Sequence, residues 1–309
     1  MRLFSSNKSD NTFVAQKGLS VSVDELISMQ QYLPYLALKQ NQFTSNRAGD
    51  VKSVFKGRGM ELEEVRAYNF GDDIRDIDWR VTARKSEPYT KVFNEEKDRE
   101  IVVVLDLSSS MVFGTRNELK SVTACKMAAL IGWMTIKNKD RFGLLLYDGQ
   151  NTIYFKPQNN MRNLMAIFKK ISDYSAKVLQ NQHRGDLSKA LNLLEYNNKG
   201  KGTIFILSDF YGFDNDKFKK IAALSHKHQI YCINIFDRIE ELAPSDGVYA
   251  AQYEAQKTVF DSSVVSFREA YKEYFMQNHN MLKKNCQQFL CRYMEIRTDV
   301  PIFKQLSLV

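Results

Sequence analysis

The sequence predicts an α/β fold, in which a doubly wound, mostly parallel six-stranded sheet carries helices on both faces and a smaller N-terminal segment packs on it. Two observations lead to this prediction. From residue 101 onward, short runs of apolar and β-branched residues alternate with longer stretches of helical periodicity, which is typical of parallel strands buried on both faces. One pair of strands is joined by the tight-turn dipeptide Asp148-Gly149, and this hairpin predicts a single antiparallel edge strand.

The N-terminal part of the chain is expected to be less regular than the sheet. Residues 1–20 are polar and lack periodicity, so they predict a flexible tail. Residues 21–99 form the N-terminal segment. There a helix over 22–40, which Pro34 should interrupt, precedes a loop with a short strand near Val51–Phe55. A densely charged stretch then leads to the first strand of the sheet.

Residues 100–309 form the predicted α/β domain. Its first strand is the continuous run Ile101–Leu105, and its first long helix, Asn117–Lys137, has apolar residues three and four positions apart. The other strands are expected at 142–147, 152–155, 203–207, 230–236 and 293–296. The other helices are expected at 160–171, 187–195, 216–226 and 262–290, with a hairpin between Val248 and Phe260.

Composition and charge exclude several classes of protein. Of 309 residues, 44% are hydrophobic and 26% are charged, as in ordinary globular proteins. No apolar run approaches the roughly 20 residues that a membrane span needs, and the first ten residues lack the apolar core of a signal peptide, so we expect a cytoplasmic protein.

The net charge of +8 comes from basic residues spread along the chain, which is more typical of a solvated surface than of a nucleic-acid site. Four cysteines without a C-x-x-C pair predict small buried apolar groups.

Polar residues follow two of the predicted strands at the point where each strand ends. Asp106, Ser108 and Ser110 come directly after the first strand, and Asp209 comes after the strand at 203–207. The carboxyl ends of parallel strands meet at one edge of a sheet, where ligands bind. Carboxylate and hydroxyl oxygens suit a hard cation such as Mg²⁺, so these four residues are candidate metal ligands. The alternative is that they cap the following helix and fill a loop.

The same residues resemble the metal-ion-dependent adhesion site of the von Willebrand factor A domain. The D-x-S-x-S motif of that site is matched by Asp106, Ser108 and Ser110, and its later Asp is matched by Asp209. The resemblance covers residues 100–297 and implies the α/β fold of that family, with Mg²⁺, or Mn²⁺ or Ca²⁺ in its place, as the bound cation.

One position departs from that family's pattern. The family's T-x-L-x-x-A-L motif reads G-D-L-S-K-A-L from Gly185 to Leu191, so a glycine replaces the Thr ligand. Asp186 can supply a carboxylate instead, which makes it a fifth candidate ligand. The missing hydroxyl predicts that the cation is held weakly.

A second resemblance rests on the charged string before the sheet. Residues 71–80 read G-D-D-I-R-D-I-D-W-R, and residues 57–61 and 93–96 add further matching positions. This pattern is similar to the bacterial family called domain of unknown function 58, over nearly the whole chain after the tail. The resemblance implies a partner, a MoxR-type AAA+ ATPase, and a role as an adaptor in the assembly or activation of a client protein complex.

The charged string also carries a prediction from its residues alone. Four aspartates interleave with Arg75, Arg80 and Arg84, which predicts an ion-pair network that pins an extended segment to the sheet, with Trp79 as a buried anchor. The alternative is a partner-docking surface or a second cation site.

Taken together, these patterns predict a non-enzymatic protein-interaction module that uses a divalent-cation adhesion site. Two alternatives stay open. A metal-dependent hydrolase at the same site would need a general base, for which His183 is the candidate. Nucleic-acid binding through the net charge would weaken steeply with salt.

Overall fold

The protein is built around a six-stranded sheet in the order β10-β7-β6-β3-β4-β5. The computed structural model describes residues 17–34, 61–85, 87–94, 99–180, 183, 186–198, 200–244, 247–253 and 256–305. The strands of this sheet are β3 (Glu100–Asp106), β4 (Arg141–Tyr147), β5 (Thr152–Gln158), β6 (Gly202–Ser208), β7 (Gln229–Phe236) and β10 (Arg292–Arg297). Neighbours pair in parallel except β4 and β5, which pair antiparallel. The predicted doubly wound sheet with one antiparallel edge strand is therefore confirmed.

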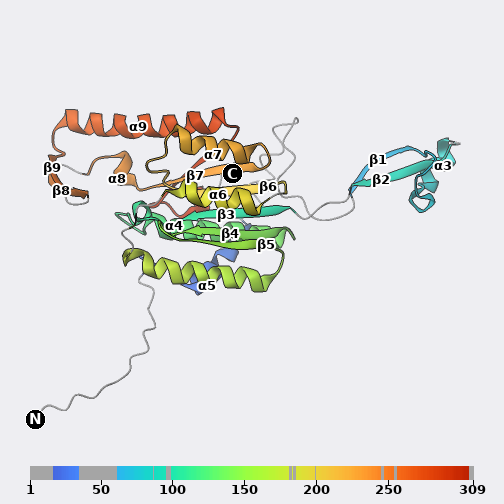
Figure 1. The fold of residues 1–309 in the computed structure, drawn as a ribbon, viewed down its shortest axis with the longest axis horizontal. Coiled ribbons are helices and arrows are strands. Elements are labelled where there is room, and N and C mark those ends of the chain that lie inside the picture. The colour runs from blue at the N-terminus through green and yellow to red at the C-terminus, as the bar shows by residue number, and fades with distance from the viewer. Residues whose placement is uncertain are drawn as a thin grey trace, which may run out of the picture.

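Helices cover both faces of the sheet (Figure 1). One face is covered by α4 (Lys120–Lys137) and α5 (Met161–Lys177). The other is covered by α6 (Leu187–Asn197), α7 (Asn215–Ser225) and α9 (Val265–Gln288). The shorter elements in the same part of the chain are η3 (Ser109–Met111), η4 (Val178–Gln180), α8 (Arg238–Glu241), α10 (Ile302–Gln305) and a hairpin of β8 (Val248–Tyr253) and β9 (Gln256–Asp261).

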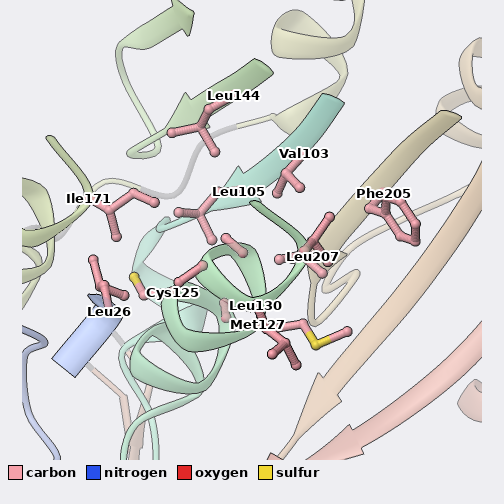
Figure 2. Close-up of a cluster of buried hydrophobic side chains, with 14 of the residues drawn as sticks. Leu26, Val103, Leu105, Cys125, Met127, Leu130, Leu144, Ile171, Phe205 and Leu207 are labelled. Atoms are coloured by element: carbon pink, nitrogen blue, oxygen red, sulfur yellow. The ribbon is translucent and has the colours of Figure 1, made fainter. Parts of the chain in front are cut away.

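The core is divided by β3, whose side chains alternate between the two faces because successive residues of a strand point to opposite sides. Val103 and Leu105 pack with Leu130 of α4, as Figure 2 shows. Val102 and Val104 belong to the second cluster, beneath α6 and α7. A strand that is buried on both faces must be apolar throughout, which explains the continuous run after Glu100.

The first part of the N-terminal segment packs on the helices of the sheet. It forms α1 (Val23–Ser28) and η1 (Met29–Tyr32). Leu26 of α1 is fully buried, and its carbonyl oxygen accepts a hydrogen bond of 3.0 Å from Nε1 of Trp133 in α4. The helix is shorter than the predicted 22–40, and the strand expected near Val51–Phe55 lies outside the described residues.

The charged string lies in a small unit of its own, which we call the signature unit (residues 61–94). It contains β1 (Glu61–Ala67), η2 (Ile74–Asp76), α3 (Trp79–Lys85) and β2 (Tyr89–Asn94), with β1 antiparallel to β2. Its ion pairs join residues within the unit. They are Arg66–Asp72 at 2.8 Å, Arg75–Asp73 at 2.7 Å and Lys91–Asp78 at 3.5 Å. Among the described residues, no hydrogen bond or ion pair ties it to the central sheet.

Trp79 is not the buried anchor that the sequence predicts, because 67% of its surface is exposed. The carboxylate of Asp78 accepts hydrogen bonds from the backbone N–H groups of Arg80 and Val81 and so starts a two-turn helix at the tryptophan. No residue of this helix is buried, and its first residue is exposed to solvent.

Three of the four cysteines lie together, which their sequence spacing does not suggest. Cys232 of β7, Cys286 of α9 and Cys291 are all buried, as predicted for small apolar groups. Hydrogen bonding from the two neighbouring thiols, together with burial, holds the pKa of Cys232 well above its usual range. Cys232 is therefore held as a protonated thiol inside the second core.

Candidate metal centre

The polar residues after β3 and β6 meet because these strands are parallel neighbours in register. Leu105 pairs with Leu207, so Asp106 and Ser208 leave the sheet side by side. The Ser208 hydroxyl donates to Oδ2 of Asp106 at 2.6 Å, and the Ser108 backbone N–H donates to Oδ1 at 2.9 Å. Asp106 is only 4% exposed, so its orientation is set by these two bonds and by the core below it.

A chain of hydrogen bonds joins this loop to the end of β6. The hydroxyls of Ser108 and Ser110 lie 3.3 Å apart, and the Ser110 hydroxyl donates to Oδ1 of Asp209 at 3.1 Å. Four predicted ligands, Asp106, Ser108, Ser110 and Asp209, therefore gather at one point. None of the four caps the following helix, since α4 begins after Leu119, which makes no side-chain cap.

Asp186, the fifth predicted ligand, reaches the same place from another element. It precedes α6 and accepts a hydrogen bond of 3.0 Å from the Ser188 backbone N–H. Its side chain also lines a pocket of about 190 Å³ together with Asp106, Ser108 and Ser110. Gly185, where the related site has a Thr, lies outside the described residues.

Asp106 and Asp209 differ in how their charge is balanced. Burial, reinforced by the charge of Asp209, raises the pKa of Asp106 to about 6, against the hydrogen bonds from Ser208 and Ser108. Within the described part of the chain, Asp106 forms no ion pair. Asp209, in contrast, pairs with Nζ of Lys120 at 2.8 Å.

Lys120 is the residue of this site that the sequence analysis missed. Its ammonium contacts Asp209 and also Oε1 of Glu240, both at 2.8 Å, and the residue is only 2% exposed. Burial alone would lower the pKa of Lys120, but the two carboxylates outweigh it and raise the pKa. A lysine at the start of a helix that is apolar over its central turns was the available signal, because such a helix is largely buried.

A third strand of the sheet also ends in a buried acid. Asp237 follows β7 and accepts hydrogen bonds from the hydroxyls of Thr115 and Thr298, at 2.5 and 2.6 Å. Burial favours a higher pKa for Asp237, but these bonds and that from the Ile239 N–H lower it. The rule that directed attention to the residues after β3 and β6 applies equally here, so the sequence contained the signal.

The donor set fits a hard cation that keeps several waters. The described residues contain no group of three or more His, Cys, Asp or Glu side chains that could hold a metal. The described part of the site offers one buried carboxylate that forms no ion pair there, two hydroxyls, and Asp209 and Asp186 at its margin. Mg²⁺ is commonly bound through one or two carboxylates with water in its other positions. Such a set predicts weak binding.

His183, the candidate base of a hydrolase, is not among the described residues that line this pocket. Its carbonyl oxygen accepts a hydrogen bond of 3.2 Å from the Ser109 N–H, while the residue itself is exposed. This contact with the loop after β3 is made by the backbone of His183.

No helix in the described part of the chain has the length and apolar character needed to cross a membrane.

Comparison with known proteins gives one family and several relatives of unknown role. The family described as "Protein of unknown function DUF58" matches residues 64–281. Uncharacterized proteins of Mycobacterium tuberculosis and Mycobacterium bovis are each 28% identical over 199 residues, which is 64% of this chain and 62% of theirs. The chain thus spans less than two thirds of the length of these relatives.

Two solved structures match this chain at low sequence identity and with TM-scores below 0.5. The conserved hypothetical protein BatB of Bacteroides thetaiotaomicron is 14% identical with a TM-score of 0.43, over 68% of this chain and 96% of that one. An aerotolerance-related membrane protein of Bacteroides fragilis is 12% identical with a TM-score of 0.41, over 68% of this chain and 100% of that one.

Proposed function

The chain belongs to the DUF58 family of proteins of unknown function, and we propose that it is a non-enzymatic adaptor that binds a partner protein through a divalent cation at the carboxyl edge of its sheet. The cation is Mg²⁺, or Mn²⁺ or Ca²⁺ in its place, held by Asp106, Ser108 and Ser110. Asp209 and Asp186 act through water or at the margin of the site.

One observation carries this proposal. Two loops that are 99 residues apart in sequence are joined by the hydrogen bond from Ser110 to Asp209, beside a buried Asp106 that has no cationic partner among the described residues. An ionised carboxylate in such a place is costly unless a positive charge compensates it. A divalent cation in the adjoining pocket supplies that charge.

The cation would leave a coordination position open toward the pocket. The pocket is also lined by Leu187, Tyr211 and Lys217, so a carboxylate entering it meets both a cation and an ammonium group. A partner's Asp or Glu side chain is the ligand that this arrangement suits, as in the von Willebrand factor A adhesion site that the D-x-S-x-S motif resembles. Binding of the cation should then strengthen when the partner is present.

The partner that we propose is a MoxR-type AAA+ ATPase, together with a client complex in the cytosol. This part rests on the resemblance of the charged string in residues 71–80 to its family. The signature unit presents Phe70, Ile74 and Trp79 to solvent, which supports a second contact surface for such a partner.

Calorimetric titration of the full chain with Mg²⁺ and Mn²⁺ tests the metal site. Asp106→Ala should abolish binding because it removes the charge at the centre of the donor set, whereas Asp73→Ala, which removes an exposed acid of the signature unit, should leave binding unchanged. Equal affinity in the wild type and Asp106→Ala would overturn the metal site.

Capture of the purified ATPase, with and without Mg²⁺ and nucleotide, tests the partner. We expect capture to depend on Mg²⁺ and to be lost in Asp106→Ala. Turnover of phosphoester substrates that requires Mg²⁺ and Asp106 would show instead that the site is a hydrolase.

A further inference from the structure

A second and larger cavity lies on the other side of the loop that follows β6. Its volume is about 540 Å³, and it is bounded by residues 209–213, by β7 and by α9. Ligand pockets of proteins typically measure about 300–1,000 Å³. Aromatic rings dominate its walls, namely Phe210, Phe213, Phe236, Tyr271, Tyr274 and Phe275.

The charged groups at this cavity are all acidic. Asp209 and Glu240 line it, and no Lys or Arg is among the described residues in its lining. Lys120 contacts both carboxylates from behind the cavity and balances one of the two negative charges. One negative charge therefore remains at an aromatic cavity, in a chain whose net charge is +8.

A buried hydrogen-bond acceptor without a partner lies in the same walls. Asn234 lines the cavity and is 2% exposed, and its Oδ1 has no hydrogen-bond partner within the described residues. Its Nδ2 contacts Nε2 of His279 and the hydroxyl of Tyr293, both at 3.1 Å. Buried polar atoms are rarely left unpaired, but this atom has almost no accessible surface, so a ligand in the cavity does not contact it in this arrangement.

We propose that this cavity binds an organic cation, an ammonium or guanidinium group carried on an apolar or aromatic body. Two properties of the walls favour this ligand. Aromatic faces attract cations, and the remaining negative charge compensates them. The ligand is a free amine or the side chain of a partner's Arg or Lys. This binding needs no metal, although Asp209 also lies at the margin of the proposed adhesion site.

Matched probes separate charge from shape. The full chain is titrated with phenethylammonium, with the neutral 2-phenylethanol and with the anion 3-phenylpropanoate, in the absence of divalent cations, and binding is followed by calorimetry. The cation should bind saturably and about tenfold more tightly than the alcohol, and the anion should not bind. Equal or tighter binding of the alcohol, or no saturable binding of the cation, would overturn the proposal.

A second pair of probes distinguishes the source of the cation. Acetyl-Phe-Arg-amide carries a guanidinium group, and acetyl-Phe-citrulline-amide carries a neutral group of the same shape. Preference for the arginine peptide over both the citrulline peptide and the free amine assigns the cavity to a partner's side chain. Preference for the free amine assigns it to a small molecule.

Two variants with matched controls place the binding in this cavity. Tyr274 lines the cavity but is 69% exposed, so Tyr274→Ala should leave folding intact and weaken phenethylammonium binding about threefold to tenfold. Tyr196→Ala, at an exposed position of α6, is its control. Glu240→Gln should weaken binding similarly, with Glu241→Gln as its control. Unchanged affinity in folded Tyr274→Ala would contradict the assignment, even where Glu240→Gln fails to fold.

Discussion

Two acidic regions of this molecule use the same residue types to different ends. At the carboxyl edge of the sheet, Lys120 pairs with acids that are 89 and 120 residues away in sequence. In the signature unit, the Asp73 carboxylate pairs with Arg75, two residues along, and that arginine side chain is 89% exposed. The ion pairs of the first region join residues that are distant in sequence, while the ion pair of the second joins residues of the same turn.

This difference separates the specificity of a sequence pattern from its contribution to stability. The string of residues 71–80 is the more distinctive pattern, yet its charges pair locally in water, where ion pairs contribute about 0–1 kcal/mol. The D-x-S-x-S loop is a shorter pattern, but its groups are buried and interlocked. A distinctive exposed string is expected to make contacts with other molecules, and a buried charge cluster is expected to fail when one member is removed.

The largest expected effect is that of Lys120→Met. Removing the ammonium leaves Asp209 in the interior without its ion pair, and breaking a buried pair in this way costs about 3–5 kcal/mol. Lys91→Met removes a half-exposed ammonium from the signature unit and should cost less than about 1 kcal/mol. Urea unfolding of the two variants measures both values.

A double variant checks the cause of that loss. Asp209→Asn in the Lys120→Met background removes the unpaired charge, so it should recover a large part of the lost stability. A loss of unfolding free energy in Lys120→Met no larger than that in Lys91→Met would contradict this prediction. It would show that the sheet edge and the signature unit tolerate the loss of an ammonium group equally well.

The second prediction concerns the pH dependence of the metal-free protein. The pKa of Asp106 is about 6 in the folded chain against an ordinary value of 3.8, so folding favours the protonated carboxyl. The free energy of unfolding should therefore fall as pH rises from about 4 to about 6, by about 2–3 kcal/mol in all, and level off above that range. Asp106→Asn should remove this loss, and saturating Mg²⁺ should offset it in the wild type.

Asp73→Asn is the matched control for that profile. The hydrogen bond from Arg75 lowers the pKa of Asp73 to about 2, but the group is exposed, so the variant should follow the wild-type curve from pH 4 to pH 8. The same loss of stability in Asp106→Asn as in the wild type would show that another group titrates.

Much of the fold could be predicted because it depends on short-range patterns. The apolar run of Ile101–Leu105 and the Asp148-Gly149 turn are local, and they determine a buried strand and the antiparallel edge strand. The meeting of Asp106 with Asp209 could also be predicted, since a general rule places ligands at the carboxyl ends of parallel strands.

The remaining features depend on contacts that no local pattern encodes. Lys120 reaches Asp209 and Glu240 because most of α4 is buried. The cluster of Cys232 with Cys286 and Cys291 forms only when β7 packs against the end of α9. Trp79 was predicted to be buried from its residue type alone, but its position at the start of a short exposed helix decides otherwise.

The smallest expected effect on stability is that of Trp79→Ala. A buried anchor would lose about 3–5 kcal/mol, but an indole that is 67% exposed should lose less than about 1 kcal/mol. Trp133→Ala is the control, because that ring is buried against Phe168 and bonded to Leu26, and it should show the full loss. In a Trp133→Phe background, the fluorescence of Trp79 should be quenched efficiently by iodide.

A binding measurement then decides what the exposed ring does. If the signature unit contacts the ATPase, Trp79→Ala should weaken capture while leaving the unfolding curve nearly unchanged, and Lys91→Met should change neither. Trp79→Ala would thus change binding without changing stability, whereas Lys120→Met is expected to lower stability strongly. A large loss of stability in Trp79→Ala, or an indole shielded from iodide, would show that Trp79 is a buried anchor. The signature unit would then resemble the sheet edge in its sensitivity to substitution.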